Sequence, residues 1–476
     1  MPDNSKMPSV SSPLSVAGLQ ETEQQRKSKL HKAIAASAMG NFTEWFDYGV
    51  YAATTAYLTQ AFFPGTLGTL GTLLGFAVSF ALRPLGGFVW GPLGDRLGRK
   101  VVLATTILLM AGSTALIGVL PTHAQVGVLA PVLLIGLRVV QGFSTGGEYG
   151  GAATFMAEYS PDNKRGRYGS FLEFGTMCGF AGGTAFVLLL QQLLTRDEMY
   201  DWGWRLPFFV AIPLGFVGWY LRHQLDDTPV FNEMADEQEK QGSAWDRFTS
   251  LIRDYKRPIL IMFGLVIALN IANYTLIAYM PTYLQGSIGM TESDSSILML
   301  IGQVLMALCI PFFGALSDRT GRKPMWWTSL IGLFIMAVPM YMLMRVGFGW
   351  AILAFVILGL LFIPQLSTIS ATFPAMFPTT VRYAGFAISY NVATAAFGGT
   401  APLVNDAVIG ETGFTLFPAF FMMGACVIGM VAVWFLTETA GVSLRGDEVP
   451  GEADDNQSPV SLLGDSGDDD PEYART

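Results

Sequence analysis

A ten-residue phrase occurs twice in this chain. Residues 91–100 read GPLGDRLGRK and residues 314–323 read GALSDRTGRK. Pro161 and Arg165 likewise match Pro378 and Arg382 at the same spacing, and a weaker third pair is LDDTP at 225–229 and LTETA at 436–440. Repeats at equivalent places indicate one structural unit used twice. The sequence therefore predicts a protein built from two related halves.

The composition places both halves in a membrane. The chain is 51% apolar and only 14% charged, whereas a soluble domain carries about 25% charged residues. Continuous apolar stretches of about 18 residues or more recur, each long enough to cross a bilayer as a helix. We predict an all-α polytopic membrane protein with twelve spans in two pseudo-symmetric six-helix bundles. The expected spans are 33–59, 70–92, 101–120, 126–156, 168–194, 205–223, 257–285, 295–316, 325–345, 349–373, 382–409 and 414–437.

Charge divides the chain into five regions and predicts its orientation. Most Lys and Arg lie in the termini, the central segment and alternate loops, so the positive-inside rule puts both termini and these loops in the cytoplasm. The last region is acidic, contributes most of the net charge of −9, and is expected to be disordered. The expected regions are a tail at 1–30, a bundle at 31–223, a linker at 224–256, a bundle at 257–440 and a tail at 441–476.

The sequence lacks the motifs that are typical of most enzyme active sites. Cys178, Cys309 and Cys426 lie inside apolar runs, and the sequence has only three His and no metal-binding, nucleophile-elbow or Walker A motif. We expect a protein that is not an enzyme, with no metal, no cofactor and no nucleic-acid partner. Its partners would be the lipid bilayer and a small molecule, and its energy source an ion gradient. A monomeric transport unit is expected.

The repeated phrase is a candidate latch between the halves. Its glycines permit close helix approach, its Asp can pair near a helix end, and its basic residues can hold the loop at the inner surface. The alternative is a topology anchor without a gating role. The predicted gating residues are Gly91, Asp95, Arg96, Arg99, Gly314, Asp318, Arg319, Arg322, Arg165 and Arg382.

The duplicated phrase, the twelve spans and the long central segment resemble the major facilitator superfamily. GNFTEWFDYGVY at 40–51, RPLGG at 83–87, QGFSTGGEYGGA at 141–152 and DWGWRLPFF at 201–209 are similar to its metabolite:proton symporters, closest to the proline/glycine-betaine osmoprotectant branch. The resemblance implies the major facilitator fold and proton-coupled import of a small zwitterion (proline, glycine betaine or ectoine) by alternating access. Osmosensing members of this group end in a coiled coil that this acidic tail lacks, which puts osmotic activation in doubt.

Polar and aromatic residues share one face of the first helix. Asn41, Glu44, Trp45, Tyr48 and Tyr51 fall within about 120°, with Asp47 at its edge. Placing a carboxylate inside a membrane costs free energy unless the group faces a cavity. We predict that these residues line the substrate site, where aromatic faces suit an ammonium group, and that Glu44 and Asp47 handle the proton. Ordinary helix packing is the alternative for the aromatic residues.

The fourth span adds Arg138, Gln141, Glu148 and Tyr149. Arg138 is expected to bind a substrate carboxylate or to pair with Glu44 or Asp47. Glu148 is a candidate proton carrier, because poor solvation favours the neutral form of a carboxyl group. A structural hydrogen bond is its alternative, and Glu173 in the fifth span has the same two interpretations.

The second half offers polar but few acidic candidates. Proton chemistry is therefore expected in the first half, and a substrate-shaping role in the second. The predicted substrate-site residues are Asn270, Asn273, Tyr274, Tyr390 and Asn391.

Two other functions stay open. One is import of a carboxylate metabolite of the α-ketoglutarate, citrate or shikimate type. Only Arg83 and Arg138 are basic inside the membrane, which argues against multiply charged anions. The other is a sensor without flux, although no sizeable signalling domain is evident. Sodium is not excluded as the coupling ion.

Overall fold

The computed structural model describes residues 23–65, 68–97, 99–146, 148–223, 253–378 and 381–444. Within these ranges every regular element is helical. The prediction of an all-α architecture is therefore confirmed. The predicted tails at 1–30 and 441–476 and the linker at 224–256 lie mostly outside the described residues, so the five predicted boundaries stay predictions. The first helix begins at Glu23, inside the predicted N-terminal tail.

The first half forms one helical rod for each predicted span. Several rods consist of two consecutive helices, because the chain bends or tightens between them. They comprise α1 (Glu23–Ala53) with α2 (Thr55–Phe62), α3 (Gly68–Ala81) with α4 (Arg83–Leu97), α5 (Arg99–Val119), α7 (Leu129–Thr145) with α8 (Glu148–Tyr159), α9 (Arg165–Leu193), and α11 (Leu206–Phe209) with α12 (Ala211–His223). The short elements α6 (His123–Val126), η1 (Asp162–Lys164), α10 (Arg196–Asp201) and η2 (Gly203–Arg205) connect them.

The second half repeats this pattern with π-helical turns inserted into two rods. Such turns are frequent at functional sites in helices. The helices are α15 (Lys256–Asn273) with π-turn η3 (Tyr274–Ala278), α16 (Met280–Tyr283) and π-turn η4 (Leu284–Ile288); α17 (Glu292–Thr320); α18 (Arg322–Leu343); α19 (Phe348–Leu366) with α20 (Ile369–Thr372) and η5 (Pro374–Met376); α21 (Arg382–Ala393) with π-turn η6 (Thr394–Gly398) and α22 (Ala401–Thr412); and α23 (Phe417–Phe435).

Nine helical stretches in the described part of the chain are long and apolar enough to cross a membrane. The rods outside this set are those of α1, α5 and α12. The rod of α1 contains Glu44 and Asp47, which lower its mean hydropathy, and α5 has a shorter apolar stretch at Thr105–Val119. These features agree with the twelve predicted spans.

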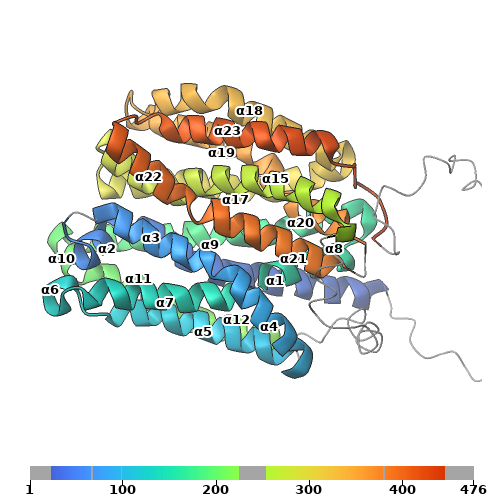
Figure 1. Cartoon of the computed structure of the whole chain (residues 1–476), viewed down its shortest axis with the longest axis horizontal. Coiled ribbons are helices and arrows are strands. Elements are labelled where there is room, and N and C mark those ends of the chain that lie inside the picture. Colours follow the sequence, from blue (N-terminus) through green and yellow to red (C-terminus); the bar gives the residue numbers. More distant parts are fainter. Residues whose placement is uncertain are drawn as a thin grey trace, which may run out of the picture.

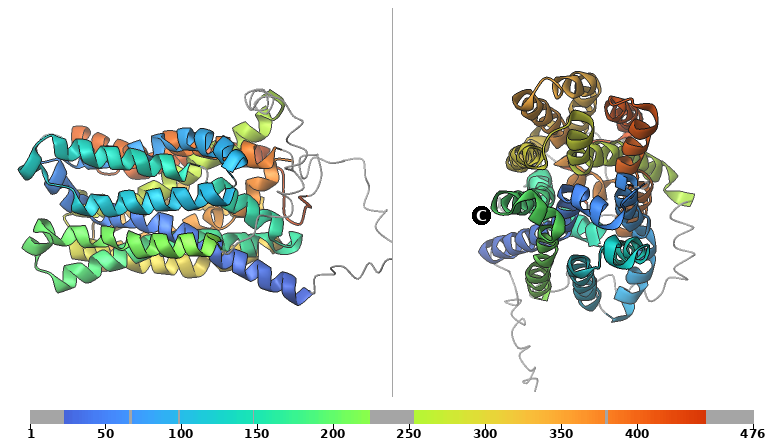
Figure 2. Two further views of the ribbon diagram at one scale, coloured as in Figure 1. Left: turned by 90° about the horizontal axis from the view of Figure 1, so that it is seen from below. Right: turned by 90° about the vertical axis from the view of Figure 1, so that its left-hand side faces the viewer.

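The helices lie roughly parallel, with the first half beside the second (Figure 1). Viewed along the helices, the two halves meet over a broad interface (Figure 2). We call the end of the interface that carries η1 and the C-terminal turn of α17 the latch end. The end that carries α10 and the N-terminal turn of α17 is the opposite end. The two names fix the positions of the contacts described below.

Helix α9 joins the halves, because it packs against α1 in its own half and against α17 in the other. Its contact with α1 depends on a stripe of glycines one turn apart. A Cβ atom on Gly175 would lie 2.3 Å from the Ala38 carbonyl oxygen, and one on Gly179 would lie 2.6 Å from that of Phe42. Small residues at this spacing let two membrane helices approach at backbone distance. The side chains of α1 are thereby held close to α9.

Candidate functional site

A buried ion pair joins α1 to the start of α4. Arg83 donates a hydrogen bond to Glu44 at 2.8 Å, and both side chains are buried. The same guanidinium nitrogen donates to the Tyr48 hydroxyl oxygen at 3.0 Å. Because Arg83 is the first residue of α4, the junction between α3 and α4 aims it at α1. Glu44 is therefore balanced by a cation inside the protein.

Aromatic rings surround the Arg83 guanidinium. Its central carbon lies 4.3 Å from the centre of the Phe80 ring, 5.3 Å from Tyr48 and 5.7 Å from Trp45. Tyr274, in π-turn η3 of the second half, packs edge-on against Phe80 at 5.0 Å. Arginine over aromatic faces gains cation–π attraction, and more when the group is desolvated. We call Trp45, Tyr48, Phe80 and Tyr274 the aromatic cage.

A second buried ion pair lies one turn further along α1. Arg138 of α7 donates to Asp47 at 2.9 Å and to Gln141 at 2.8 Å, and Gln141 donates back to Asp47 at 3.2 Å. The Arg138 guanidinium also stacks on the Tyr51 ring, 3.5 Å from its centre. Of the two roles expected for Arg138, the structure shows pairing with a carboxylate on α1, and that carboxylate is Asp47.

The residues on the predicted face of α1 thus contact three different helices. Asn41 does not join either ion pair: its amide donates to the Leu172 carbonyl oxygen at 2.9 Å and to the Thr176 hydroxyl, both on α9. Glu44, Trp45 and Tyr48 meet Arg83, and Tyr51 meets Arg138.

Tyr149 and Tyr390 meet between the halves. Their rings stack with centres 4.7 Å apart and an interplanar angle of 18°. The Tyr149 hydroxyl donates to Glu173 of α9. Asn391, beside Tyr390, donates across the same boundary to the Gly146 carbonyl oxygen at 2.9 Å. Both predicted residues of α21 therefore contact the first half.

The remaining second-half candidates differ in how their polar atoms are satisfied. Asn270 donates to Thr394 at 2.9 Å, which ties α15 to π-turn η6. The Asn273 carbonyl oxygen and the Tyr274 hydroxyl are buried without a hydrogen-bond partner among the described residues, as are both polar atoms of Gln365. Buried polar groups normally have partners, so such atoms mark places where a water or ligand fits.

Two small cavities lie among the described helices. One lies within the first half and is lined by Glu44, Asp47 and Thr114 among others. The other lies between the halves, where Phe180 and Thr184 of α9 face Gln303 of α17. The cavity within the first half thus borders both ion pairs. Among the described residues, no cluster of three His, Cys, Asp or Glu side chains is placed to hold a metal ion.

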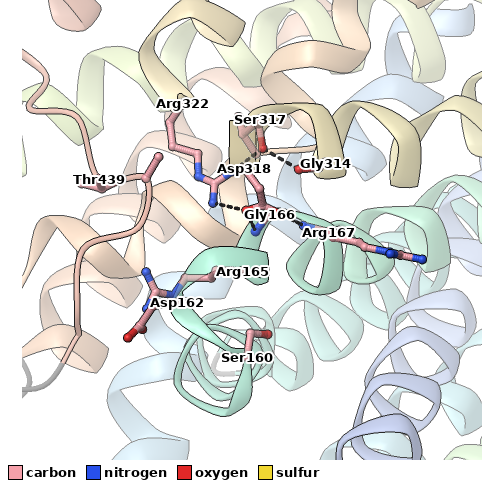
Figure 3. Close-up of polar contacts among 12 residues, drawn as sticks. Ser160, Asp162, Arg165, Gly166, Arg167, Gly314, Ser317, Asp318, Arg322 and Thr439 are labelled. Atoms are coloured by element: carbon pink, nitrogen blue, oxygen red, sulfur yellow. Dashed lines mark hydrogen bonds and ion pairs between the residues drawn. The ribbon is translucent and has the colours of Figure 1, made fainter. Parts of the chain in front are cut away.

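The second copy of the repeated phrase contacts the first half, at the place where the sequence predicts a latch (Figure 3). Asp318 accepts hydrogen bonds from the backbone nitrogens of Gly166 and Arg167 at 2.7 and 2.9 Å, and from Arg322 at 2.7 Å. The guanidinium of Arg322 also donates to Ser317. Gly314 packs so closely against α9 that a Cβ atom there would lie 2.6 Å from the Gly166 carbonyl oxygen. One carboxylate thus binds the N-terminus of α9 in the other half.

The paired arginines Arg165 and Arg382 make equivalent contacts in the two halves. Each donates from its Nε atom to the carbonyl oxygen eight residues earlier, Ala157 at 3.1 Å and Pro374 at 3.0 Å. Arg382 also crosses the interface, donating to Glu158 at 3.0 Å. Burial raises the cost of the charged form and lowers the pKa of Arg382, which Glu158 counteracts.

A strap formed by residues 442–444 lies across the latch end. Arg165 donates to the Val442 carbonyl oxygen at 3.0 Å, and Arg382 donates to that of Leu444 at 2.7 Å. The Leu444 side chain is buried with Ala157 of the first half and Ala375 of the second. The strap therefore touches both halves.

The other predicted gating residues stand apart from this network. Arg319 is exposed, and no hydrogen bond or ion pair of its side chain is found in the described part of the chain. The first copy of the phrase lies at the junction of α4 and α5. The surroundings of Gly91 and the side chains of Asp95, Arg96, Arg99 and Glu148 lie outside the described part of the structure.

The opposite end is joined by a smaller set of contacts. Arg196 and Tyr200 of α10 both donate to Glu292 of α17, each at 2.9 Å. Gln192 donates to Ser293 at 2.7 Å. The first half therefore contacts the second at this end as well.

Sequence reasoning missed three parts of the site. The sequence shows Arg83 as a basic residue in the membrane followed by a proline, but it does not show the helix junction that aims Arg83 at α1. Glu438, in the LTETA motif, accepts from the backbone nitrogens of Arg322 and Lys323 at 2.9 and 3.0 Å, and so caps α18. The third repeat pair pointed to it. The strap had no signal in the sequence.

Comparison with known proteins agrees with this architecture. The Major Facilitator Superfamily profile matches residues 37–402. The chain is 41% identical to the ectoine/proline transporter ProP of Corynebacterium glutamicum, over 88% of this chain and 86% of that protein. It is 39% identical to the glycine betaine/proline/ectoine/pipecolic acid transporter OusA of Dickeya dadantii, over 88% and 85%. It is 38% identical to the proline/betaine transporter of Escherichia coli strain K12, over the same shares.

Solved structures show the same fold. The proton:xylose symporter XylE bound to 6-bromo-6-deoxy-D-glucose superposes with a TM-score of 0.67 at 17% identity, covering 89% of this chain and 98% of that one. At this identity the likeness supports the fold alone. The predicted major facilitator fold is confirmed, and the chain belongs to the Major Facilitator Superfamily, among its proline/betaine-type transporters.

Proposed function

We propose that this protein is a proton-coupled symporter that imports a small zwitterion, such as proline, glycine betaine or ectoine, into a bacterial cell. Relatives that are about two-fifths identical over most of the chain carry the names of these solutes. The protein would lie in the cytoplasmic membrane with both termini inside, as the positive-inside rule predicts. The latch end would then face the cytoplasm.

The observation that carries the substrate class is the Glu44–Arg83 pair inside the aromatic cage. A zwitterion brings one charge of each sign, so its carboxylate can bind Arg83 while its ammonium binds Glu44 and the rings. The net charge of the buried site does not change in this exchange, which avoids the large cost of an unpaired ion in the membrane. A dicarboxylate would leave an excess negative charge in the same place.

The cage also suits alternating access. Trp45, Tyr48 and Phe80 belong to the first half and Tyr274 to the second, so the cage is complete only when the halves approach. The predicted second-half residues Asn270, Asn273, Tyr390 and Asn391 would shape the substrate from the other side. Asn273 and Tyr274 have buried polar atoms that a substrate can satisfy. Opening at the two ends in turn would expose this site to each side of the membrane.

The proton would be taken by a buried carboxylate of the first half. The predicted candidates are Glu44, Asp47 and Glu148, with Arg138, Gln141 and Tyr149 as neighbours on α7 and α8. Protonation of Glu44 or Asp47 would release its arginine partner, which supplies a direct link between ion binding and substrate binding.

Uptake into proteoliposomes tests the proposal. Radiolabelled proline and glycine betaine are supplied under an inward proton gradient, with and without a protonophore, to the wild type and to Glu44→Gln. We expect wild-type accumulation that the protonophore abolishes, and loss of uptake in the variant because Arg83 is left without its partner. Glu411→Gln, at an exposed carboxylate of α22, is the matched control and should accumulate normally.

Two outcomes would contradict the proposal. If a dicarboxylate or shikimate accumulates while neither zwitterion moves, the substrate class is wrong. If a sodium gradient drives uptake and a proton gradient does not, the coupling ion is wrong.

A further inference from the structure

Glu173 is a third buried carboxyl group. Unlike Glu44 and Asp47, it forms no ion pair with an arginine in the described part of the chain. It lies on α9 and is 2% exposed. The Tyr149 hydroxyl donates to it, the Thr176 and Ser370 hydroxyls also lie beside its carboxyl group, and no Lys forms an ion pair with it in the described ranges. An ionised carboxylate in this position lacks the cation that would offset its desolvation. Its neutral form is therefore the one that the closed protein accommodates.

Glu44 and Asp47 differ from Glu173 in this respect. Each accepts a hydrogen bond from a buried guanidinium, at 2.8 and 2.9 Å, and a close cation favours the ionised form of a carboxyl group. Protonating either one would leave a buried arginine unpaired, whereas protonating Glu173 leaves no charge behind. The electrostatic distinction among the three carboxyl groups is thus set by the positions of Arg83 and Arg138.

Glu173 also faces the boundary between the halves. Gly169, one helical turn earlier on the same face of α9, packs against Ser370 of α20, where a Cβ atom would lie 3.3 Å from the serine Cβ. The Ser370 side chain is buried, and its hydroxyl lies beside the Glu173 carboxyl group and the Tyr149 hydroxyl. Tyr149, the donor to Glu173, stacks on Tyr390 of α21. Both α20 and α21 belong to the second half.

The titratable groups around Glu173 come from three other elements. They are Tyr149 of α8, Tyr390 of α21 and Glu44 of α1. Glu44 is balanced by Arg83, and the two tyrosines are neutral, so none supplies a positive charge to an ionised Glu173. Separation of the halves at the latch end would instead supply water. Glu173 lies about 12 Å along α9 from Arg165 at that end.

We infer that Glu173, with Tyr149, Tyr390 and Ser370, forms the proton-binding site that couples the proton gradient to opening of the latch end. This inference rests on the proposed function and assigns its proton to Glu173 in place of the predicted candidates Glu44, Asp47 and Glu148. A proton from water on the opposite side bonds to a carboxylate oxygen of Glu173, and the neutral group permits the halves to close over it. When the latch end opens, the O–H bond breaks and the proton passes to water on the latch side. Glu44 and Asp47 then serve the substrate site with their arginines.

Glu173→Gln tests this inference, because an amide resembles the neutral acid but cannot release a proton. Purified wild type, Glu173→Gln, Glu173→Asp and the control Glu411→Gln are reconstituted, and two assays use radiolabelled proline. Counterflow at equal pH measures substrate exchange without net proton movement. Uphill accumulation under a proton gradient measures coupling. We expect Glu173→Gln to keep counterflow and to lose accumulation, Glu173→Asp to restore part of it, and the control to match the wild type.

The outcomes separate the two proposals. If the wild type shows neither counterflow nor accumulation of proline or glycine betaine, the proposed function fails. If the wild type is coupled and Glu173→Gln still accumulates proline, the inference about Glu173 is wrong.

A measurement on the wild type covers the case in which Glu173→Gln does not fold. Dicyclohexylcarbodiimide reacts with protonated carboxyl groups in apolar surroundings, and peptide mass spectrometry locates the adduct. We expect labelling at Glu173. Labelling confined to Glu44 or Asp47 would overturn the inference.

Discussion

The two ends of the inter-half interface are held by the same kinds of residue in opposite surroundings. At the latch end, Asp318 and Arg382 reach across to α9 and to Glu158, and their side chains are 8% and 1% exposed. At the opposite end, Glu292 is 19% exposed and its partner Arg196 is 74% exposed. Exposed ion pairs contribute little because water screens them, whereas breaking a buried hydrogen-bonded pair is costly. The latch end should therefore be the tighter of the two.

The strap makes the difference larger. Residues 442–444 bind Arg165 and Arg382 through backbone carbonyl oxygens and bury Leu444 between the halves. The opposite end relies on side-chain contacts of Arg196, Tyr200 and Gln192. An alternating-access protein with one strong and one weak closure rests with the weak end open more often. The comparison thus predicts a resting preference for opening at the opposite end.

The largest effect is expected from Asp318→Asn. Asparagine carries no charge, so the charge-assisted hydrogen bonds from the Gly166 and Arg167 nitrogens that close the latch should weaken by about 1.5–3 kcal/mol. We expect the initial rate of proline uptake to fall by at least about tenfold, since 1.4 kcal/mol is already a factor of ten. The matched control is Asp162→Asn, whose carboxylate is 51% exposed and pairs with Arg165 within one half. Equal rates in the two variants would contradict a dominant latch.

Leu444→Ala tests the contribution of the strap. Truncating a buried leucine should destabilise the closed form by about 2–3 kcal/mol. A lower melting temperature in detergent would report the loss. Leu193→Ala, at an exposed leucine near the opposite end of α9, serves as the control and should melt like the wild type. An unchanged melting temperature for Leu444→Ala would show that the strap does not hold the halves together.

Gly166→Ala tests the close approach at the latch. A Cβ atom there would lie 2.5 Å from both the Gly314 carbonyl oxygen and the Ser317 hydroxyl, so the helices must shift. Overpacking of this kind costs about 1–3 kcal/mol. Slower proline uptake should follow. Gly286→Ala, in π-turn η4 near the opposite end, adds a methyl group with no atom within 4 Å and should leave uptake unchanged. Slower proline uptake by Gly286→Ala than by Gly166→Ala would contradict the conclusion that the latch end is the more tightly packed.

The smallest effect is expected from Glu292→Gln. Because Arg196 is largely exposed, loss of this pair should change the stability of the closure by about 0.2–1 kcal/mol. Raising the salt concentration should reduce the difference from the wild type further, as screening weakens exposed pairs. Uptake measured at low and high salt checks both statements. A loss as large as that of Asp318→Asn would make the two ends equivalent.

Much of the fold could be predicted because it depends on local sequence. Long apolar stretches specify membrane helices whatever their neighbours are. The repeat also predicted equivalent positions, and Arg165 and Arg382 do bind the carbonyl oxygen eight residues earlier in both halves. Asp318 and Arg322 were expected at the interface and lie there.

The pairing of side chains across helices could not be predicted in the same way. Periodicity places Asn41, Glu44 and Tyr51 on one face of α1, but each meets a different helix, because several neighbours surround that face. Arg138 had two possible carboxylate partners, and only the tertiary position of α7, which packs against α3, α4 and α5, selects Asp47. The Arg196–Glu292 pair depends on α10, a short helix whose position is set by tertiary packing. The roles of all these residues in transport stay predictions.

Distances between spin labels at the two ends test the central claim, which is that the ends open alternately and that the latch end is the tighter. In a variant without Cys178, Cys309 and Cys426, one label pair at Asn163 and Thr320 reports the latch end. A second pair at Asp197 and Met290 reports the opposite end. We predict a single short distance at the latch and a broader, longer distribution at the opposite end, with Asp318→Asn reversing the two. A long latch distance in the wild type, or both ends opening together, would contradict the claim.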